Sequence, residues 1–160
     1  MTAIKTVIFT IIAPGTVAGL VPYLLLSSGL DRWRAWHGFP RWPGAAIMAA
    51  GACIYFWCAW NFTFTGKGTP SPTHAPTELV AVGLYRFTRN PMYVGVISVL
   101  LGESLFFRSP LLLGYTLLVF LGFNMFIIFY EEPTLKKNFG ESYERYCSNV
   151  PRWVFFKRRK

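Results

Sequence analysis

Two apolar runs, separated only by Arg108 and Ser109, make up residues 91–130: PMYVGVISVLLGESLFFRSPLLLGYTLLVFLGFNMFIIFY. Apolar stretches of about 17–20 residues are long enough to cross a bilayer as helices. The very short connection makes the two predicted helices, 91–107 and 110–130, antiparallel neighbours. This stretch therefore predicts an integral membrane protein built from helices.

Two further apolar runs precede this pair, at residues 4–30 and 43–64. The first contains Pro14 and Pro22, so we expect that span to be kinked or broken. The chain is 53% hydrophobic and 14% charged, whereas soluble domains carry about 25% charged residues. We expect one all-α domain over residues 1–160, with about four transmembrane helices and a cytoplasmic helical C-terminal segment.

The distribution of basic residues predicts which side of the membrane faces the cytoplasm. Four spans place twelve of the sixteen Lys and Arg residues on the side of both termini and the 65–90 loop, and only Arg32, Arg34, Arg41 and Arg108 on the other. The positive-inside rule makes the richer side cytoplasmic. The net charge of +9 then reflects topology and contact with membrane lipids rather than nucleic-acid binding. A bacterial inner membrane is the expected location, and the oligomeric state stays open.

A polar segment, YRFTRNPMY at residues 85–93, stands directly before the third apolar run. Asn90 is expected to cap this helix and Pro91 to occupy its first turn. The helix N-terminus, with Arg86 and Arg89 beside it, then forms a site for an anion such as a carboxylate. The alternative is that these arginines serve only as topology signals.

A second polar segment, EEPTLKKNFG at residues 131–140, follows the fourth run. Pro133 is expected to start a new helix and Gly140 to end it. One interpretation is that Glu131 and Glu132 only stabilise the N-terminus of that helix, where acidic side chains are favourable. The other is that one of these carboxylates binds hydroxyl groups or a cation. The two segments should meet at adjacent helix ends. An anion site, two carboxylates and tyrosine faces together suit S-adenosylmethionine, whose sulfonium is attracted to aromatic rings.

These segments resemble the superfamily of isoprenylcysteine carboxyl methyltransferases and phospholipid N-methyltransferases. The resemblance rests on AVGLYRFTRNPMYVG and EEPTLKKNFGESYERYCSNVPRW, and it covers about residues 78–153. It implies a membrane methyltransferase whose S-adenosylmethionine pocket lies at the cytoplasmic ends of the last spans, within segments 78–95 and 131–153, beneath the C-terminal segment. This sequence has Asn90 where the prenylcysteine enzymes have histidine.

The resemblance also assigns residues to the two motifs. It places Gly83, Tyr85, Arg89, Asn90, Pro91, Tyr93 and Gly95 in the first motif, and Glu131, Glu132, Leu135, Phe139, Gly140, Tyr143 and Tyr146 in the second. We expect the first set, with Glu131 and Glu132, to bind the cofactor. No metal site is expected, because the three cysteines and two histidines lack ligand spacing.

Methyl transfer requires alignment of nucleophile and methyl group and exclusion of water. Glu131, Glu132 and Tyr93 are candidate proton acceptors, and Arg152 is expected to orient an anionic group of the acceptor. The expected acceptor is a small lipophilic or lipid molecule, as in the isoprenylcysteine enzymes; a phospholipid amine and a thiol are the alternatives. A non-catalytic helper protein of the same fold is the rival from another class.

Two polar residues within the spans have open roles. Glu103 is expected near the interface opposite Pro91, paired with Arg108. Asn124 lies seven residues before Glu131, on the same helix face. It either lines the pocket or bonds between helices.

Overall fold

The computed structural model describes residues 12–29, 38, 40–65 and 83–153, with side chains in all but residues 62–65. These ranges contain helices and no strand, which confirms the all-α prediction. The elements are η1 (Thr16–Leu20), α2 (Val21–Ser27), α3 (Trp42–Thr65), η2 (Gly83–Arg86), α4 (Pro91–Phe107), α5 (Pro110–Phe126), η3 (Ile127–Glu131), α6 (Glu132–Phe139) and α7 (Glu141–Asn149).

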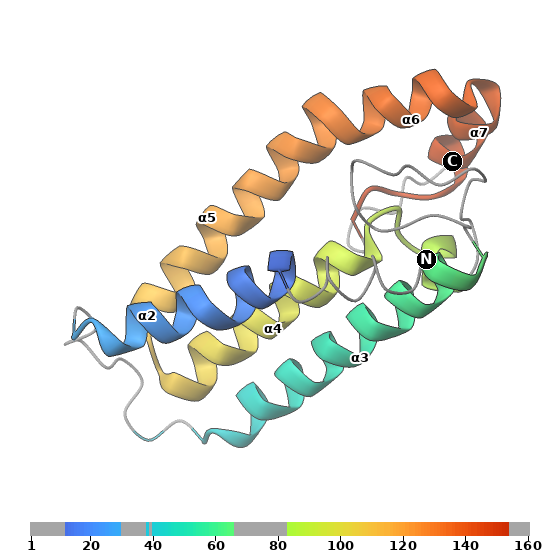
Figure 1. Ribbon diagram of the computed structural model, residues 1–160. Coiled ribbons are helices and arrows are strands. Elements are labelled where there is room, and N and C mark those ends of the chain that lie inside the picture. Colours follow the sequence, from blue (N-terminus) through green and yellow to red (C-terminus); the bar gives the residue numbers. More distant parts are fainter. Residues whose placement is uncertain (1–11, 30–37, 39, 66–82, 154–160) are drawn as a thin grey trace.

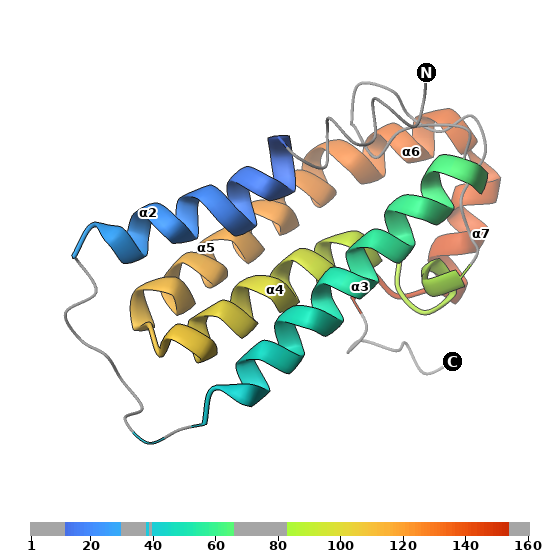
Figure 2. The same cartoon turned by 60° about the horizontal axis from the view of Figure 1, so that its bottom comes forward.

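The helices form an elongated bundle (Figure 1). α3 and α4 run side by side, and α5 leads away from α4 (Figure 2). α2 lies along α5, and η1 contacts α4. α6 continues α5, and α7 folds back beneath α6 at the end of the bundle that also holds η2. This arrangement brings the segments before α4 and after α5 to the same end, as the sequence predicts.

Glycines let the backbones of α3 and α4 touch. A Cβ atom added at Gly51 would lie 2.7 Å from the carbonyl oxygen of Gly95, and one at Gly102 would lie 2.7 Å from that of Gly44. Since ordinary Cβ contacts are 3.4 Å or longer, no larger side chain fits at these positions unless the helices move. Beside this contact, a core of Tyr55, Ala59, Val96 and Leu100 fills the bundle.

The connection between α4 and α5 is as short as the sequence predicts. Arg108 adopts a left-handed conformation (φ 56°) at the end of α4, and its N–H donates to the Ser104 and Leu105 carbonyls. Ser109 then caps α5, because its side chain accepts a hydrogen bond from the Leu112 N–H at 3.0 Å. The two helices are therefore antiparallel neighbours, which confirms the prediction from the sequence.

Two prolines are each preceded by a π-helical turn. η1 ends two residues before Pro22, and η3 ends two residues before Pro133. In each turn the closing N–H, of Val21 or Glu132, donates to the carbonyl five residues back. The wider turn makes room for a ring that lacks an N–H, so the helix continues.

These turns correct two expectations. Pro133 does not start a new helix, because α5, η3 and α6 form one helix from Pro110 to Phe139. The described part of the first apolar run is one helix from Ile12 to Ser27, so this part is not broken at Pro14 or Pro22. The expected start of that span, residues 4–11, lies outside the described residues. Gly140 does end α6, with φ 52°.

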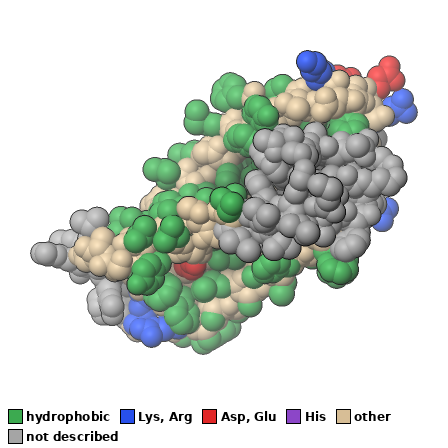
Figure 3. Space-filling view, viewed as in Figure 1, with side chains coloured by type: hydrophobic (Ala, Val, Ile, Leu, Met, Phe, Trp, Pro, Cys, Tyr) green, Lys and Arg blue, Asp and Glu red, His purple; other side chains and the backbone are tan. Residues whose placement is uncertain are grey.

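Two described helices, Trp42–Asn61 and Pro110–Phe139, are long and apolar enough to cross a membrane. Two more apolar helices, Ile12–Ser27 and Pro91–Phe107, are shorter. On the face in Figure 3, hydrophobic side chains occupy the middle of the molecule, while Lys and Arg lie towards its two ends. This distribution is typical of a membrane protein.

Glu103 departs from its expected pairing with Arg108. Its side chain is buried within the bundle, and its Oε2 has no hydrogen-bond partner among the described residues. None of the ion pairs of the described part of the chain includes it.

Candidate functional site

Glu132 is held between two arginines from distant parts of the chain. Arg152 binds it through two parallel hydrogen bonds, Nε to Oε1 at 2.9 Å and Nη2 to Oε2 at 2.7 Å. Nη1 of Arg89 lies 3.0 Å from Oε1. The side chains of Glu132 and Arg89 are 21% and 15% exposed, so these ion pairs are screened less by water than surface pairs. Hydrogen bonding to Glu132 also raises the pKa of Arg152.

Glu131, the neighbouring carboxylate, has a different partner. The Tyr93 hydroxyl donates to its Oε2 at 2.8 Å, which connects the first turn of α4 to the end of η3. The Tyr93 ring also packs against Phe123, with the ring centroids 4.7 Å apart. Glu131 is thus bound by a neutral hydroxyl group, whereas Glu132 is bound by two guanidinium groups.

The segment Val150–Trp153, called the C-terminal strap from here on, lies across the start of α4. The Arg89 N–H donates to the Pro151 carbonyl at 3.0 Å. The carbonyl of Arg152 accepts hydrogen bonds from Thr88 Oγ1 at 2.8 Å and Asn90 Nδ2 at 3.1 Å. Three consecutive residues before α4 therefore fasten the strap.

Trp153 and Tyr146 tie the C-terminal part of the chain to the bundle at two more points. Trp153 Nε1 donates to Asn124 Oδ1 at 3.0 Å, and its ring packs against Phe120. Asn124 thus joins the strap to α5, rather than bonding between helices of the bundle. On the other side, the Tyr146 hydroxyl donates to the carbonyl of Tyr85 at 2.6 Å.

Arg89 has a spare donor inside the site. Its Nη1 also donates to the Cys147 sulfur at 2.8 Å, but its buried Nε has no partner among the described residues. A buried, unpartnered guanidinium N–H is costly unless an acceptor meets it. The carboxylate of an amino-acid-like ligand has the chemistry that would satisfy this donor.

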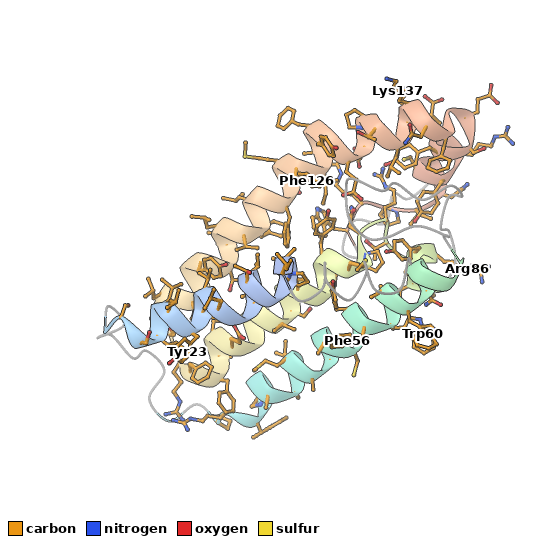
Figure 4. The ribbon with its side chains drawn as sticks, in the orientation of Figure 1. Tyr23, Phe56, Trp60, Arg86, Phe126 and Lys137 are labelled. Atoms are coloured by element: carbon orange, nitrogen blue, oxygen red, sulfur yellow. The ribbon has the colours of Figure 1, made fainter. Side chains whose placement is uncertain are left out.

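The structure brings most of the predicted residues together. Tyr85, Arg89, Asn90, Pro91, Tyr93, Glu131, Glu132 and Arg152 all lie at this end of the bundle. Two details differ from expectation. Asn90 occupies the N-cap position of α4, but its side chain makes no capping hydrogen bond, because it is used by the strap. Arg86 is exposed and points away from the bundle (Figure 4).

The two motif glycines lie elsewhere. Gly95 faces α3, where an added Cβ atom would lie 2.9 Å from the carbonyl oxygen of Gly51. Gly83 has φ 58°, and an added Cβ atom would lie 3.3 Å from Asn61 Nδ2 and 3.5 Å from Trp57 Nε1. Both glycines therefore pack closely against α3, Gly95 against its backbone and Gly83 against the side chains of Asn61 and Trp57.

Other residues of the site were not found by sequence reasoning. Thr88, Cys147 and Trp153 have no charge or regular spacing that marks them. The Arg-Trp pair after Pro151 was the available signal for the strap. In the described residues, no three His, Cys, Asp or Glu side chains are grouped so as to hold a metal ion.

A family model described as phospholipid methyltransferase matches residues 39–142, well over half of the chain. The chain belongs to the phospholipid methyltransferase family. No curated protein and no solved structure matched the chain in the corresponding comparisons.

Membership of the phospholipid methyltransferase family extends the resemblance drawn from the motifs. The match begins before α3, so it includes the second apolar run, for which the motifs gave no information. It ends at residue 142 and thus contains Arg89, Tyr93, Glu131 and Glu132 but not Arg152. The family indicates a membrane methyltransferase.

Proposed function

We propose that this chain transfers the methyl group of S-adenosylmethionine to the amine of a phospholipid at the cytoplasmic face of a membrane. The observation that carries the proposal is the family match over residues 39–142, taken with Arg89, Glu131 and Glu132, which come together inside that range. We therefore favour a phospholipid amine as the methyl acceptor over an isoprenylcysteine-type acceptor or a thiol.

The residues at the site fit the cofactor. Arg89 offers an unpartnered buried N–H for its carboxylate, while Glu131 retains acceptor capacity for its amino group or ribose hydroxyls. Tyr93 and Phe123 present packed aromatic faces, which attract a cation. When bound, S-adenosylmethionine supplies an electrophilic methyl group on a positively charged sulfur.

The chain's own residues then have two tasks. An amine attacks only in its neutral form, so a proton must leave it before or during transfer. Glu131 is the proposed acceptor, because its single described partner is a tyrosine hydroxyl. The strap and the rings of Phe120 and Trp153 would exclude water from the reacting groups;.

Glu132 is proposed to have a structural role and not to accept a proton. Its two oxygens are engaged by Arg89 and Arg152, so it orients Arg89 and fastens the strap. Arg152 would then position the strap over the cofactor. It would contact an anionic group of the acceptor only after leaving Glu132.

Four crossings with both termini in the cytoplasm are part of this proposal. They are supported by the two long and two shorter apolar helices and by the excess of basic residues on one side. Accessibility of engineered cysteines to a membrane-impermeant maleimide tests the topology. Cysteines placed in 66–82 and at the C-terminus should react only from the cytoplasmic side.

Calorimetry on the purified chain in detergent tests cofactor binding. Saturable binding of S-adenosylmethionine is expected, weakened in Arg89→Ala and Glu131→Ala. Transfer of a labelled methyl group to phosphatidylethanolamine, a prenylcysteine analogue and a small thiol then separates the acceptors. Labelled phosphatidylethanolamine supports the proposal. Exclusive labelling of another acceptor refutes the amine, and binding without any transfer favours a non-catalytic helper.

A further inference from the structure

An apolar groove with a volume of about 690 Å³ opens between α3 and η2. One wall comes from α3 through Cys53, Ile54 and Trp57, and the other comes from the η2 region through Leu84, Arg86 and Phe87. The positive φ of Gly83 and its close approach to Trp57 bring η2 against α3 at this point. The groove is thus a product of the same turn that precedes the candidate site.

The groove combines exposed aromatic walls with a single charge. Trp57 and Phe87 are 62% and 68% exposed, which is unfavourable in water but suits contact with acyl chains at a membrane edge. Arg86 is the one charged side chain in the lining, and none of the described carboxylates pairs with it. Guanidinium groups bind phosphate through two hydrogen bonds.

The same short element, η2, also contacts the candidate site. Tyr85, between two lining residues, is buried against Cys58 and Met92, and its carbonyl accepts the hydrogen bond from Tyr146. Burial raises the pKa of Tyr85, and the charges of neighbours that include Glu131 raise it further. The groove and the candidate site therefore share η2 as a neighbour.

We propose that this groove docks the phospholipid acceptor, with an acyl chain along Ile54, Trp57 and Phe87 and the phosphate on Arg86. The assignment rests on the proposed function and adds a place for the acceptor beside the cofactor site. Its chemistry decides the class of ligand: an apolar channel with one guanidinium at its rim fits a phosphate with a hydrocarbon chain. A polar, water-soluble ligand would leave most of this apolar lining without an apolar partner.

Cys53 provides a test that does not depend on turnover. It is exposed in the groove, while Cys58 is buried. The full chain in neutral detergent is treated with N-ethylmaleimide, and alkylation of each cysteine is followed by peptide mass spectrometry. Dioleoyl phosphatidylethanolamine or phosphatidylcholine should slow alkylation of Cys53 in a saturable way. Dioleoylglycerol, which has the chains but no phosphate, should protect at about tenfold higher concentration.

Variants of Arg86 provide the matched comparison. Arg86→Gln should raise the half-protecting concentration of phosphatidylethanolamine about tenfold, while Arg86→Lys should keep most of the protection. Equal protection by diacylglycerol and phospholipid, or absence of protection by both, overturns the proposal without any variant. Protection that is unchanged in Arg86→Gln overturns the role of the phosphate.

The same samples separate this inference from the proposed function. Protection of Cys53 without methyl transfer to phosphatidylethanolamine upholds a phospholipid groove and refutes the proposed acceptor. Methyl transfer to phosphatidylethanolamine without protection of Cys53 upholds the function and shows that the acceptor enters elsewhere, which overturns the groove.

Discussion

The contact between α3 and α4 makes Gly51→Ala a severe change for a single methyl group. The added Cβ atom would lie 2.7 Å from Gly95 O, 2.8 Å from Ser98 Cβ and 2.8 Å from Val99 N. All three neighbours are in α4, and two of them are backbone atoms that no rotamer change can move. The helices would have to separate by about 0.7 Å to reach the ordinary contact distance of 3.4 Å.

The free energy needed to separate the helices is partly offset by the higher helix propensity of alanine. Overpacking of this kind costs about 1–3 kcal/mol, whereas replacing glycine by alanine inside a helix contributes about 1 kcal/mol. Gly122 in α5 is the matched control, because nothing lies within 4 Å of its added Cβ atom. Gly51→Ala should therefore lower the free energy of unfolding by up to about 2 kcal/mol, while Gly122→Ala should leave it unchanged or raise it by up to about 1 kcal/mol.

Alkylation of Cys58 on heating provides the assay. This side chain on α3 is 0% exposed, so it reacts only when the bundle opens. The two variants differ by the overpacking cost of about 1–3 kcal/mol, so the midpoint of Gly51→Ala should fall about 2–12 °C below that of Gly122→Ala, at about 2–4 °C per kcal/mol. Gly51→Ala combined with Gly95→Ala should cost less than the sum of the two, since one movement relieves both clashes. Equal midpoints for the Gly51 and Gly122 variants would refute the backbone contact.

Three further changes test the site and the bundle. Tyr93→Phe removes the hydrogen bond to Glu131 and keeps the ring, so we expect a loss of about 1–2 kcal/mol in unfolding free energy; an unchanged melting midpoint would show that the bond does not stabilise the fold. Arg152→Gln should release the strap from Glu132 and increase proteolysis after residue 149, while Arg152→Lys should show an intermediate rate; wild-type proteolysis rates in both would contradict this role. Glu103→Gln should be at least as stable as the wild type by thermal melting, because it removes a buried carboxylate whose Oε2 has no hydrogen-bond partner among the described residues; a clear fall in the midpoint would reveal a partner for the charge.

The sequence predicted which residues meet at the end of the bundle that holds the candidate site, because its signals are local. The short Arg108-Ser109 connection determines that α4 and α5 are antiparallel, so the segments at their far ends must meet. The meeting of Tyr93 with Glu131 and of Arg89 with Glu132 follows from that geometry. Gly140 ended α6 as predicted, because its backbone has a positive φ, which glycine adopts readily and which stops the helix.

Other features depend on contacts that one segment alone does not reveal. Pro133 ordinarily marks a helix start, but the π-turn η3 absorbs its ring and the helix continues. Gly95 fell within the motif, yet its neighbour is the backbone of α3. Asn90 has the usual capping side chain, but the strap competes for it. In each case a partner far along the chain determines the role.

In the proposed transmembrane arrangement, the length of the α5–η3–α6 helix would determine the depth of the candidate site in the bilayer. Its 30 residues extend for about 45 Å at 1.5 Å per residue, whereas the hydrocarbon layer is about 30 Å thick. With Pro110 at one boundary, the opposite boundary falls near Tyr130, and α6 projects beyond it. Glu131 and Glu132 then lie at the level of the lipid head groups. A water-soluble cofactor and a lipid amine would meet there without either leaving its own solvent.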